Sequence, residues 1–478
     1  MANLAIAKKL VQELVSLGVR EFCLGAGSRN SPLVAAIASS PDVKSYFFFD
    51  ERSAAFFALG RIQASGHPVA VVTTSGTAAA EMLPAMIEGH YAGLPLIAVT
   101  ADRPPRYRGT GAPQAIEQKH LFGPYAEIFW EGPAESGAEL KNHQQLLSFS
   151  SELSSWTRLR PIHLNVFFDE PLLETEVELP RYLLPVPKAP ELLLGLDRVT
   201  SVSQTLSTFL TAAQRPVVLL SGIPARARGY VEEFCLRLGA PIYAEAPSGL
   251  RESSRLKSLL ICSGERQIYQ GKFDALLRLG SVPTCRLWRD LESSLSHLKV
   301  LSLDHRPFSG SPRVVHQQIE LSSWLLEHVV MPQKKFSDGF YSDFFQEDQR
   351  RNEQKLALFS QHPHSEPALM HHLSRRIPKR AQVFLGNSLA IREWDLAADR
   401  GQRGYEFFAN RGANGIDGEV STFLGCCADD NDNVAILGDL TALYDLSAPW
   451  IVDQLGDPAF QIVVINNGGG RILVVCPF

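Results

Sequence analysis

The sequence contains no C-x-x-C pair, although it has seven cysteines. Most of these cysteines lie inside apolar runs, which indicates reduced, buried thiols and argues against a disulfide framework or a zinc site. The chain also lacks a basic excess, because its formal net charge is -5 at pH 7, and this argues against a nucleic-acid or anionic-membrane partner. No apolar run reaches the roughly 18 uncharged residues that a membrane span needs. We therefore expect a cytoplasmic protein whose partners are small molecules.

The chain has no low-complexity tract and no short-period repeat, and its 478 residues are enough for roughly three domains of about 150 residues each. Short apolar runs alternate with helical patterns in three blocks, which is typical of parallel sheets with helices on both faces. The predicted fold class is therefore α/β, with three doubly wound parallel-sheet domains at residues 1–180, 196–335 and 355–478. A proline-rich stretch over 180–190 is expected to link the first two domains.

The clearest βαβ crossover lies in the first block. A strand is expected over 69–73, followed by a Ser-Gly-Thr turn, a helix over about 78–90, and a second strand over 96–100.

In the third block, polar residues end two successive predicted strands, one at Gly438-Asp439 and the other at Asn466-Asn467. The carboxyl ends of such strands lie side by side, where open α/β folds bind ligands. Either motif alone is more often an ordinary turn at the end of a strand. The two motifs together, separated by the length of a βαβ unit, offer the hard oxygen donors that Mg²⁺ or Ca²⁺ prefers. Between the two strands, Pro449 should interrupt the crossover helix, with Ser447 capping a new one.

This Gly-Asp and double-Asn pairing resembles the diphosphate-and-metal motif of thiamine diphosphate enzymes. The resemblance implies that Asp439, the Asn467 side chain and the Gly469 carbonyl hold Mg²⁺, or Mn²⁺, against the cofactor's diphosphate. Such enzymes also need a glutamate beside the aminopyrimidine ring, and Glu51 opens a helix after a hydrophobic strand in "SYFFFDERSAAFFALGRI". Its Phe-rich neighbours would desolvate the carboxylate so that it exchanges a proton with the ring. Read alone, a glutamate here more often complements a helix N-terminus.

Eight segments between Ser28 and Gly470 resemble, in the right order, the family of 2-succinyl-5-enolpyruvyl-6-hydroxy-3-cyclohexene-1-carboxylate (SEPHCHC) synthase, a thiamine-dependent enzyme of menaquinone biosynthesis. They are "GAGSRNSPL", "DERSAAFFALG", "TSGTAAAEMLPAMIE", "TADRPP", "GAPQAIEQ", "GNSLAIRE", "NRGANGIDG" and "GDLTALYDL". The resemblance implies decarboxylation of 2-oxoglutarate and addition of the resulting succinyl-semialdehyde anion to isochorismate. It also implies a homodimer or homotetramer whose active sites form between subunits.

Two substrates that each carry two carboxylates call for arginine, whose planar fork meets a carboxylate bidentately. Arg29, Arg103, Arg392 and Arg411 follow apparent strands. An isolated arginine is more often a solvated surface charge, but the motifs that flank these four favour a binding role. By resemblance, the residues that contact substrate or intermediate are Ser28, Arg29, Arg103, Gln114, Ser388, Arg392 and Arg411. Arg286 stands where the family carries a basic residue. Ile416 would be the apolar residue that bends the cofactor into a V.

The sequence also departs from the family pattern. Ala26 stands where proline is usual, and Arg471 and Leu473 change the segment after the asparagines. The third block is shorter than in the family, from which we expect an exposed sheet edge. Two alternatives remain: another thiamine-dependent 2-oxoacid decarboxylase or acetolactate-type synthase, and a truncated, non-catalytic chain that binds cofactor. The arginines argue against the first alternative, because pyruvate has only one carboxylate.

Overall fold

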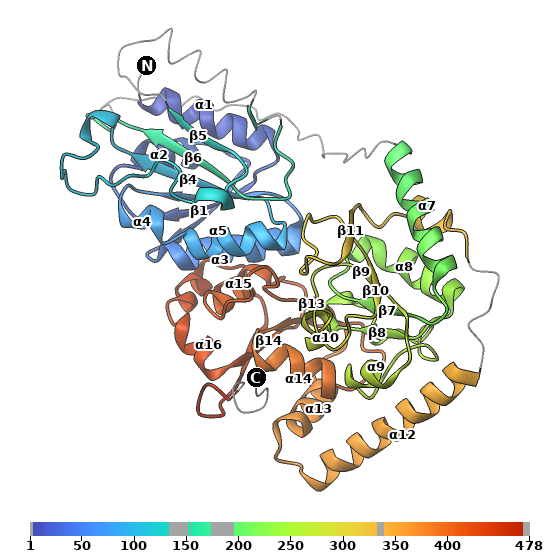
Figure 1. Ribbon diagram of the computed structural model, residues 1–478. Coiled ribbons are helices and arrows are strands. Elements are labelled where there is room, and N and C mark those ends of the chain that lie inside the picture. Colours follow the sequence, from blue (N-terminus) through green and yellow to red (C-terminus); the bar gives the residue numbers. More distant parts are fainter. Residues whose placement is uncertain (1–2, 133–151, 154, 174–195, 332–338, 472–478) are drawn as a thin grey trace. The chain divides into compact units, whose positions relative to one another are not determined.

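The computed structural model describes residues 3–132, 152–153, 155–173, 196–331 and 339–471 (Figure 1). Its strands form three sheets in which all pairings are parallel, and this confirms the predicted fold class. No helix among these described residues is long and apolar enough to cross a bilayer. The predicted linker at 180–190, Leu473 and Cys476 lie outside the described residues.

The chain packs as two compact units. The first combines Met1–Glu191 with Gly412–Asp429 and Leu440–Pro458, and the second combines Leu192–Arg411 with Asp430–Asp439 and Ala459–Phe478. The first sheet lies in the first unit, and the other two sheets lie in the second unit. The three domain boundaries drawn from the sequence stay a prediction.

The first sheet has the strand order β2-β1-β3-β4-β6-β5. Its helices α1 and α2 lie on one face, and α3 and α5 lie on the other (Figure 1). A fully apolar core fills the space under α1, because the inward residues of β1, β3, β4 and β6 are aliphatic or aromatic. The strands are β1 (Glu21–Gly25), β2 (Lys44–Phe48), β3 (Val69–Thr73), β4 (Leu96–Asp102), β5 (Phe129–Gly132) and β6 (Ile162–Phe167). The helices are α1 (Asn3–Ser16), α2 (Ser31–Ala38), α3 (Glu51–Ser65), α4 (Thr77–Ala80) and α5 (Leu83–Ala92), with 3-10 turns at Pro105–Tyr107 and Gly123–Tyr125.

The βαβ crossover predicted in this sheet is present, with one correction. Strand 69–73 is confirmed as β3, and the next strand continues to Asp102. The single helix predicted over 78–90 is wrong, because the segment forms two helices, α4 and α5. Pro84 explains the break: it sits in the first turn of α5, where it needs no amide hydrogen, and it could not occupy the interior of one continuous helix.

The second sheet has the order β11-β10-β9-β7-β8 and belongs to the second unit. Its strands are β7 (Pro216–Leu220), β8 (Ile242–Ala244), β9 (Ala275–Leu279), β10 (Lys299–Asp304) and β11 (Val315–Gln318). Its helices are α7 (Leu196–Ala212), α8 (Ala225–Leu238), α9 (Arg266–Gln270), α10 (Arg286–Asp290), α11 (Ser323–Glu327) and α12 (Gly339–Gln361), with a 3-10 turn at Ala246–Ser248.

The third sheet has the order β13-β12-β14-β15. Among the described residues β15 pairs with β14 alone, and Val464 on this strand is 43% exposed. The exposed edge expected from the length of the third block stays a prediction. The strands are β12 (Gln382–Leu385), β13 (Glu406–Phe408), β14 (Asn433–Gly438) and β15 (Phe460–Ile465). The helices α13 (Glu366–Arg376) and α14 (Leu389–Ala397) belong to the second unit. The first unit contains α15 (Glu419–Cys426), all of α16 (Asp439–Tyr444) except its first residue, and a 3-10 helix at Ala448–Gln454.

The crossover between β14 and β15 is interrupted near Pro449, as predicted, and Ser447 is the N-cap of the next helix with Pro449 in its first turn. The following segment is a 3-10 helix, and the Ser447 side chain makes no capping hydrogen bond. The Ser447 hydroxyl donates to Asp50 Oδ2 at 2.5 Å.

The six described cysteines are all free, and four of them are buried. This confirms the prediction of reduced thiols for this part of the chain.

Candidate active site

Glu51 lies at the first position of α3, directly after β2. Asp50 is the N-cap and accepts a hydrogen bond from the Ser53 amide at 3.1 Å, which fixes the start of the helix. A Cβ added to Gly25 at the end of β1 would stand 3.0 Å from Glu51 Cγ, so this carboxyl group packs against the carboxyl edge of the sheet. Burial raises the pKa of Glu51, and the charges of Asp50 and Glu81 add to this rise. The carboxyl group is thus poised to hold a proton more readily than a solvated glutamate.

The helix that carries Glu51 crosses α15 at very short range. A Cβ on Gly60 would stand 2.0 Å from the Thr422 carbonyl oxygen, and one on Gly425 would stand 2.2 Å from the Phe57 carbonyl oxygen. Glycine at both positions therefore allows the two backbones to touch. Ile416, the predicted cofactor support, lies half-buried in the loop that leads into α15.

The start of that loop is held by a buried carboxylate of α5. Glu88 is 3% exposed and accepts hydrogen bonds from the amides of Gly412 at 2.6 Å, Ala413 at 2.7 Å and Asn414 at 3.3 Å. Sequence reasoning did not single out this residue.

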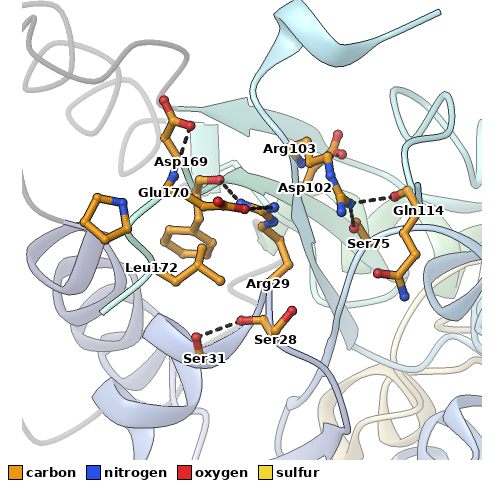
Figure 2. Close-up of polar contacts among 12 residues, drawn as sticks. Ser28, Arg29, Ser31, Ser75, Asp102, Arg103, Gln114, Asp169, Glu170 and Leu172 are labelled. Atoms are coloured by element: carbon orange, nitrogen blue, oxygen red, sulfur yellow. Dashed lines mark hydrogen bonds and ion pairs between the residues drawn. The ribbon is translucent and has the colours of Figure 1, made fainter. Parts of the chain in front are cut away.

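Arg29 and Arg103 follow the carboxyl ends of β1 and β4, which share one edge of the first sheet (Figure 2). Arg29 is 7% exposed and donates to the Phe168 carbonyl and to Glu170, each at 3.0 Å. Its Nε atom is buried and makes no hydrogen bond with the described residues. This unused N–H donor is what a carboxylate-binding arginine should offer.

The Arg103 guanidinium lies between Ser75 and the backbone of Gln114 (Figure 2). It donates to Ser75 Oγ at 2.9 Å and to the Gln114 carbonyl at 3.1 Å, so the structure brings these two predicted residues together. The Gln114 side chain is exposed, and its φ is +56°, a conformation that non-glycine residues adopt at a cost. Ser28 is exposed beside Arg29, and its carbonyl accepts from Ser31 Oγ at 2.7 Å (Figure 2).

Three further predicted residues meet at the carboxyl ends of β12 and β13. Ser388 is the N-cap of α14 with φ +67°, and its carbonyl oxygen accepts from Arg392. Arg411 donates to Asn387 Oδ1 at 2.7 Å, and Asn387 in turn donates to the Asn410 carbonyl at 2.9 Å. Asn387 thus links the Arg411 loop to the start of α14.

Among the described contacts, none joins Arg286 to the residues around Arg29 and Arg103 or to those around Arg392 and Arg411. It begins α10 beside the second sheet, is 46% exposed, and forms an ion pair with Asp290 at 3.4 Å.

The predicted metal ligands lie at neighbouring strand ends, as expected. In the β14–β15 register Gly438 pairs with Ile465, so Asp439 and the two asparagines extend from the same edge. The Asn467 Nδ2 atom donates to both carboxylate oxygens of Glu366, at 3.2 and 3.3 Å. Because the amide N–H₂ is used in this way, the amide oxygen is the atom left to meet a cation.

Gly468, Gly469 and Gly470 all have positive φ, between +67° and +81°, which suits a backbone that turns tightly around a ligand. No group of three or more His, Cys, Asp or Glu side chains that could hold a metal occurs within the described ranges. The predicted set has a single carboxylate, and Mg²⁺ bound in this manner is normally completed by phosphate oxygens and water. The donors present therefore fit a cation that arrives with a diphosphate.

The first part of the chain matches a known domain family. Residues 4–121 match the family described as thiamine pyrophosphate enzyme, N-terminal TPP binding domain. This match covers the helix that carries Glu51 and the loops that carry Arg29, Arg103 and Gln114.

Relatives extend the likeness along nearly the whole sequence. The SEPHCHC synthase of Bdellovibrio bacteriovorus is 43% identical over 99% of this chain and 86% of its own length. The chain belongs to the SEPHCHC synthase family. The SEPHCHC synthases of Akkermansia muciniphila and Lysinibacillus sphaericus are 35% and 31% identical over 99% and 98% of the chain, and over 85% and 84% of their own lengths.

The sequence analysis missed two residues that organise the candidate site. Asn387 precedes Ser388 directly after a strand, and this position could have marked it. Glu88 gives no local signal, because its partners are 324 or more positions away in the sequence.

Proposed function

We propose that this chain catalyses the thiamine diphosphate-dependent decarboxylation of 2-oxoglutarate and the addition of the resulting succinyl-semialdehyde anion to isochorismate, giving SEPHCHC in menaquinone biosynthesis. The observation that carries the proposal is the 43% identity with a SEPHCHC synthase over 99% of the chain. The structure supports it with a proton-exchanging carboxyl group and two arginine groups, each at the carboxyl edge of a parallel sheet.

When bound, thiamine diphosphate supplies a thiazolium ring that takes up the electrons released with CO₂. Asp439, the Asn467 amide oxygen and the Gly469 carbonyl would hold Mg²⁺, or Mn²⁺, against its diphosphate. Glu51 would exchange a proton with the aminopyrimidine, a task that its raised pKa favours because the protonated form is accessible nearer neutral pH. Ile416 would support the bent cofactor from the loop before α15.

The arginines would bind the carboxylates of the two substrates. Arg29 has a buried N–H free for a carboxylate, whereas Arg103 is already oriented by Ser75 and Gln114. Ser388, Arg392 and Arg411 would present a second set of donors from α14 and its neighbouring loop. Bidentate pairing would fix the orientation of each substrate as well as its affinity. Ser28 and Gln114, both exposed, would complete the polar contacts, and Arg286 stays a weaker candidate because it is paired with Asp290.

We further propose a homodimer or homotetramer with active sites between subunits. The support is a group of exposed apolar side chains in the first unit, among them Leu443 at 61%, Leu446 at 71% and Trp450 at 58% exposure, which a partner surface would cover. The cytoplasmic location stays a prediction from the sequence.

The test is CO₂ release from 2-oxoglutarate or pyruvate, each with thiamine diphosphate and Mg²⁺, in the presence and absence of isochorismate. We expect turnover of 2-oxoglutarate that isochorismate accelerates, and little turnover of pyruvate. The variant Glu51→Gln should lose about 100-fold or more of this rate, because proton transfer by a positioned group contributes roughly that much. Preference for pyruvate would overturn the proposed substrate and favour an acetolactate-type synthase.

A further inference from the structure

Glu88 is a buried carboxylate that the proposed reaction does not use. It is 3% exposed, and the three amides that it binds belong to consecutive residues, Gly412 to Asn414. A carboxylate that is removed from water must be compensated by strong donors, and three backbone N–H groups provide that compensation. Glu88 and these amides thus depend on each other.

The backbone at position 412 approaches the backbone of α5 so closely that only glycine fits there. A Cβ on Gly412 would stand 2.2 Å from the Glu88 carbonyl oxygen and 2.8 Å from the Ala92 amide nitrogen. We call the contact between the Glu88 carboxylate and the amides of residues 412–414 the clamp. Its last residue, Asn414, has φ +64°. The clamp therefore fixes both the position and the conformation of this short segment.

The other end of the same loop is fixed by α3. A Cβ on Gly418, the N-cap of α15, would stand 2.0 Å from the ring of Phe56, so the backbone lies directly on that ring. Ile416 lies between these two anchors, and Arg411 directly precedes the first one. Two helices of the first sheet, α5 and α3, thus define the path of the segment 412–418 that carries Ile416 and that Arg411 precedes in the sequence.

We infer that Glu88 is a positioning residue, which holds the 412–414 segment so that Ile416 can support the cofactor and Arg411 can meet a substrate carboxylate. The inference rests on the proposed function for the roles of Ile416 and Arg411, but the clamp itself is independent of any ligand. Glu88 does not touch the reacting atoms in this role.

The first measurement uses the chain without ligand. Hydrogen exchange should show the amides of residues 412–414 protected in the wild-type protein, although they lie in a loop. The variant Glu88→Gln turns one acceptor oxygen into an N–H₂ donor that faces other donors, so exchange at these amides should rise by about tenfold or more. Glu353→Gln, at an exposed position of α12, is the matched control and should leave their exchange unchanged. Unprotected amides in the wild type, or unchanged exchange in a folded Glu88→Gln variant, would overturn the clamp.

The second measurement asks whether the clamp serves the cofactor. Calorimetric titration with thiamine diphosphate and Mg²⁺ should give a Kd about tenfold higher for Glu88→Gln than for the wild type, with kcat at saturating cofactor reduced less than the affinity. Gly412→Ala should reproduce the effect with Glu88 intact, since its Cβ would push the segment away from α5. Faster exchange in Gly412→Ala with an unchanged Kd would contradict the positioning role. A wild-type chain that binds no cofactor would instead refute the proposed function, while the exchange result would stand.

Discussion

Three glutamates near the candidate site have different surroundings. Glu88 accepts hydrogen bonds from three backbone amides. Burial raises the pKa of Glu51. Glu393 is 7% exposed beside Glu366, and burial together with this second carboxyl group raises its pKa to about 8. The same residue type can therefore serve as an anchor, a proton exchanger or a neutral hydrogen-bond donor.

The raised pKa of Glu393 predicts a specific pH dependence of stability. Between the unfolded pKa near 4.5 and the folded pKa of about 8, the native state binds more protons than the unfolded state. The free energy of unfolding contributed by this group therefore falls as pH rises through that window. Glu393→Gln mimics the protonated acid and removes the dependence, so the variant should gain melting temperature relative to the wild type from pH 5 to pH 8. A difference in melting temperature that is constant across these pH values, as expected for exposed Glu353→Gln, would contradict this assignment.

The positions of Glu51 and of most of the arginines next to a strand end or helix start could be predicted from the sequence, because local pattern marks these points. Their roles in the site stay predictions. The contacts of Glu88 and Glu366 could not be predicted, because their partners are brought near only by the fold. Arg286 differs from the other arginines: the resemblance selected it, and in the structure its exposed side chain forms an ion pair with Asp290 of the same helix.

At the scale of elements, the crossing of α3 and α15 joins the helix that carries Glu51 to the helix that follows Ile416. The crossing needs glycine at Gly60 and Gly425, because added Cβ atoms would meet backbone atoms, which cannot move aside as a flexible side chain can. The close packing of α3 against α15 thus depends on glycine, which has no side chain, at the point of contact.

Gly60→Ala should therefore lower the melting temperature by more than about 2 °C, since overpacking a helix contact costs about 1–3 kcal/mol. The matched control is Gly229→Ala on α8, where an added Cβ meets nothing within 4 Å. At this exposed position of α8, alanine should stabilise the protein by about 0.5–1 kcal/mol. If Gly60→Ala melts at or above the wild-type temperature, the close crossing is wrong.

Helices and strands could be predicted from the sequence where the spacing of hydrophobic residues and the turn residues indicate the same structure. Strand β3 matches its prediction exactly in its bounds, and the Asp439 and Asn467 strand ends are neighbours as expected. The helix break before Pro84 was misjudged, because it depends on how proline starts a helix. Ser447 is the N-cap as predicted, but the helix after it is a 3-10 helix and the serine side chain makes no capping hydrogen bond.

For the whole molecule, family membership and the three parallel sheets agree with a thiamine diphosphate-dependent enzyme. The sequence pattern could predict the sheets and the order of the motifs. It could not predict that segments 412–429 and 440–458 pack with the first sheet, since such packing depends on contacts between distant parts of the chain.

The most direct test of the central claim is mass spectrometry of the product formed from uniformly ¹³C-labelled 2-oxoglutarate and unlabelled isochorismate, with thiamine diphosphate and Mg²⁺. We predict SEPHCHC that carries every labelled carbon of 2-oxoglutarate except the one lost as CO₂, and no such product with Glu51→Gln. Release of labelled succinic semialdehyde with isochorismate left unchanged would contradict the proposed carboligase function.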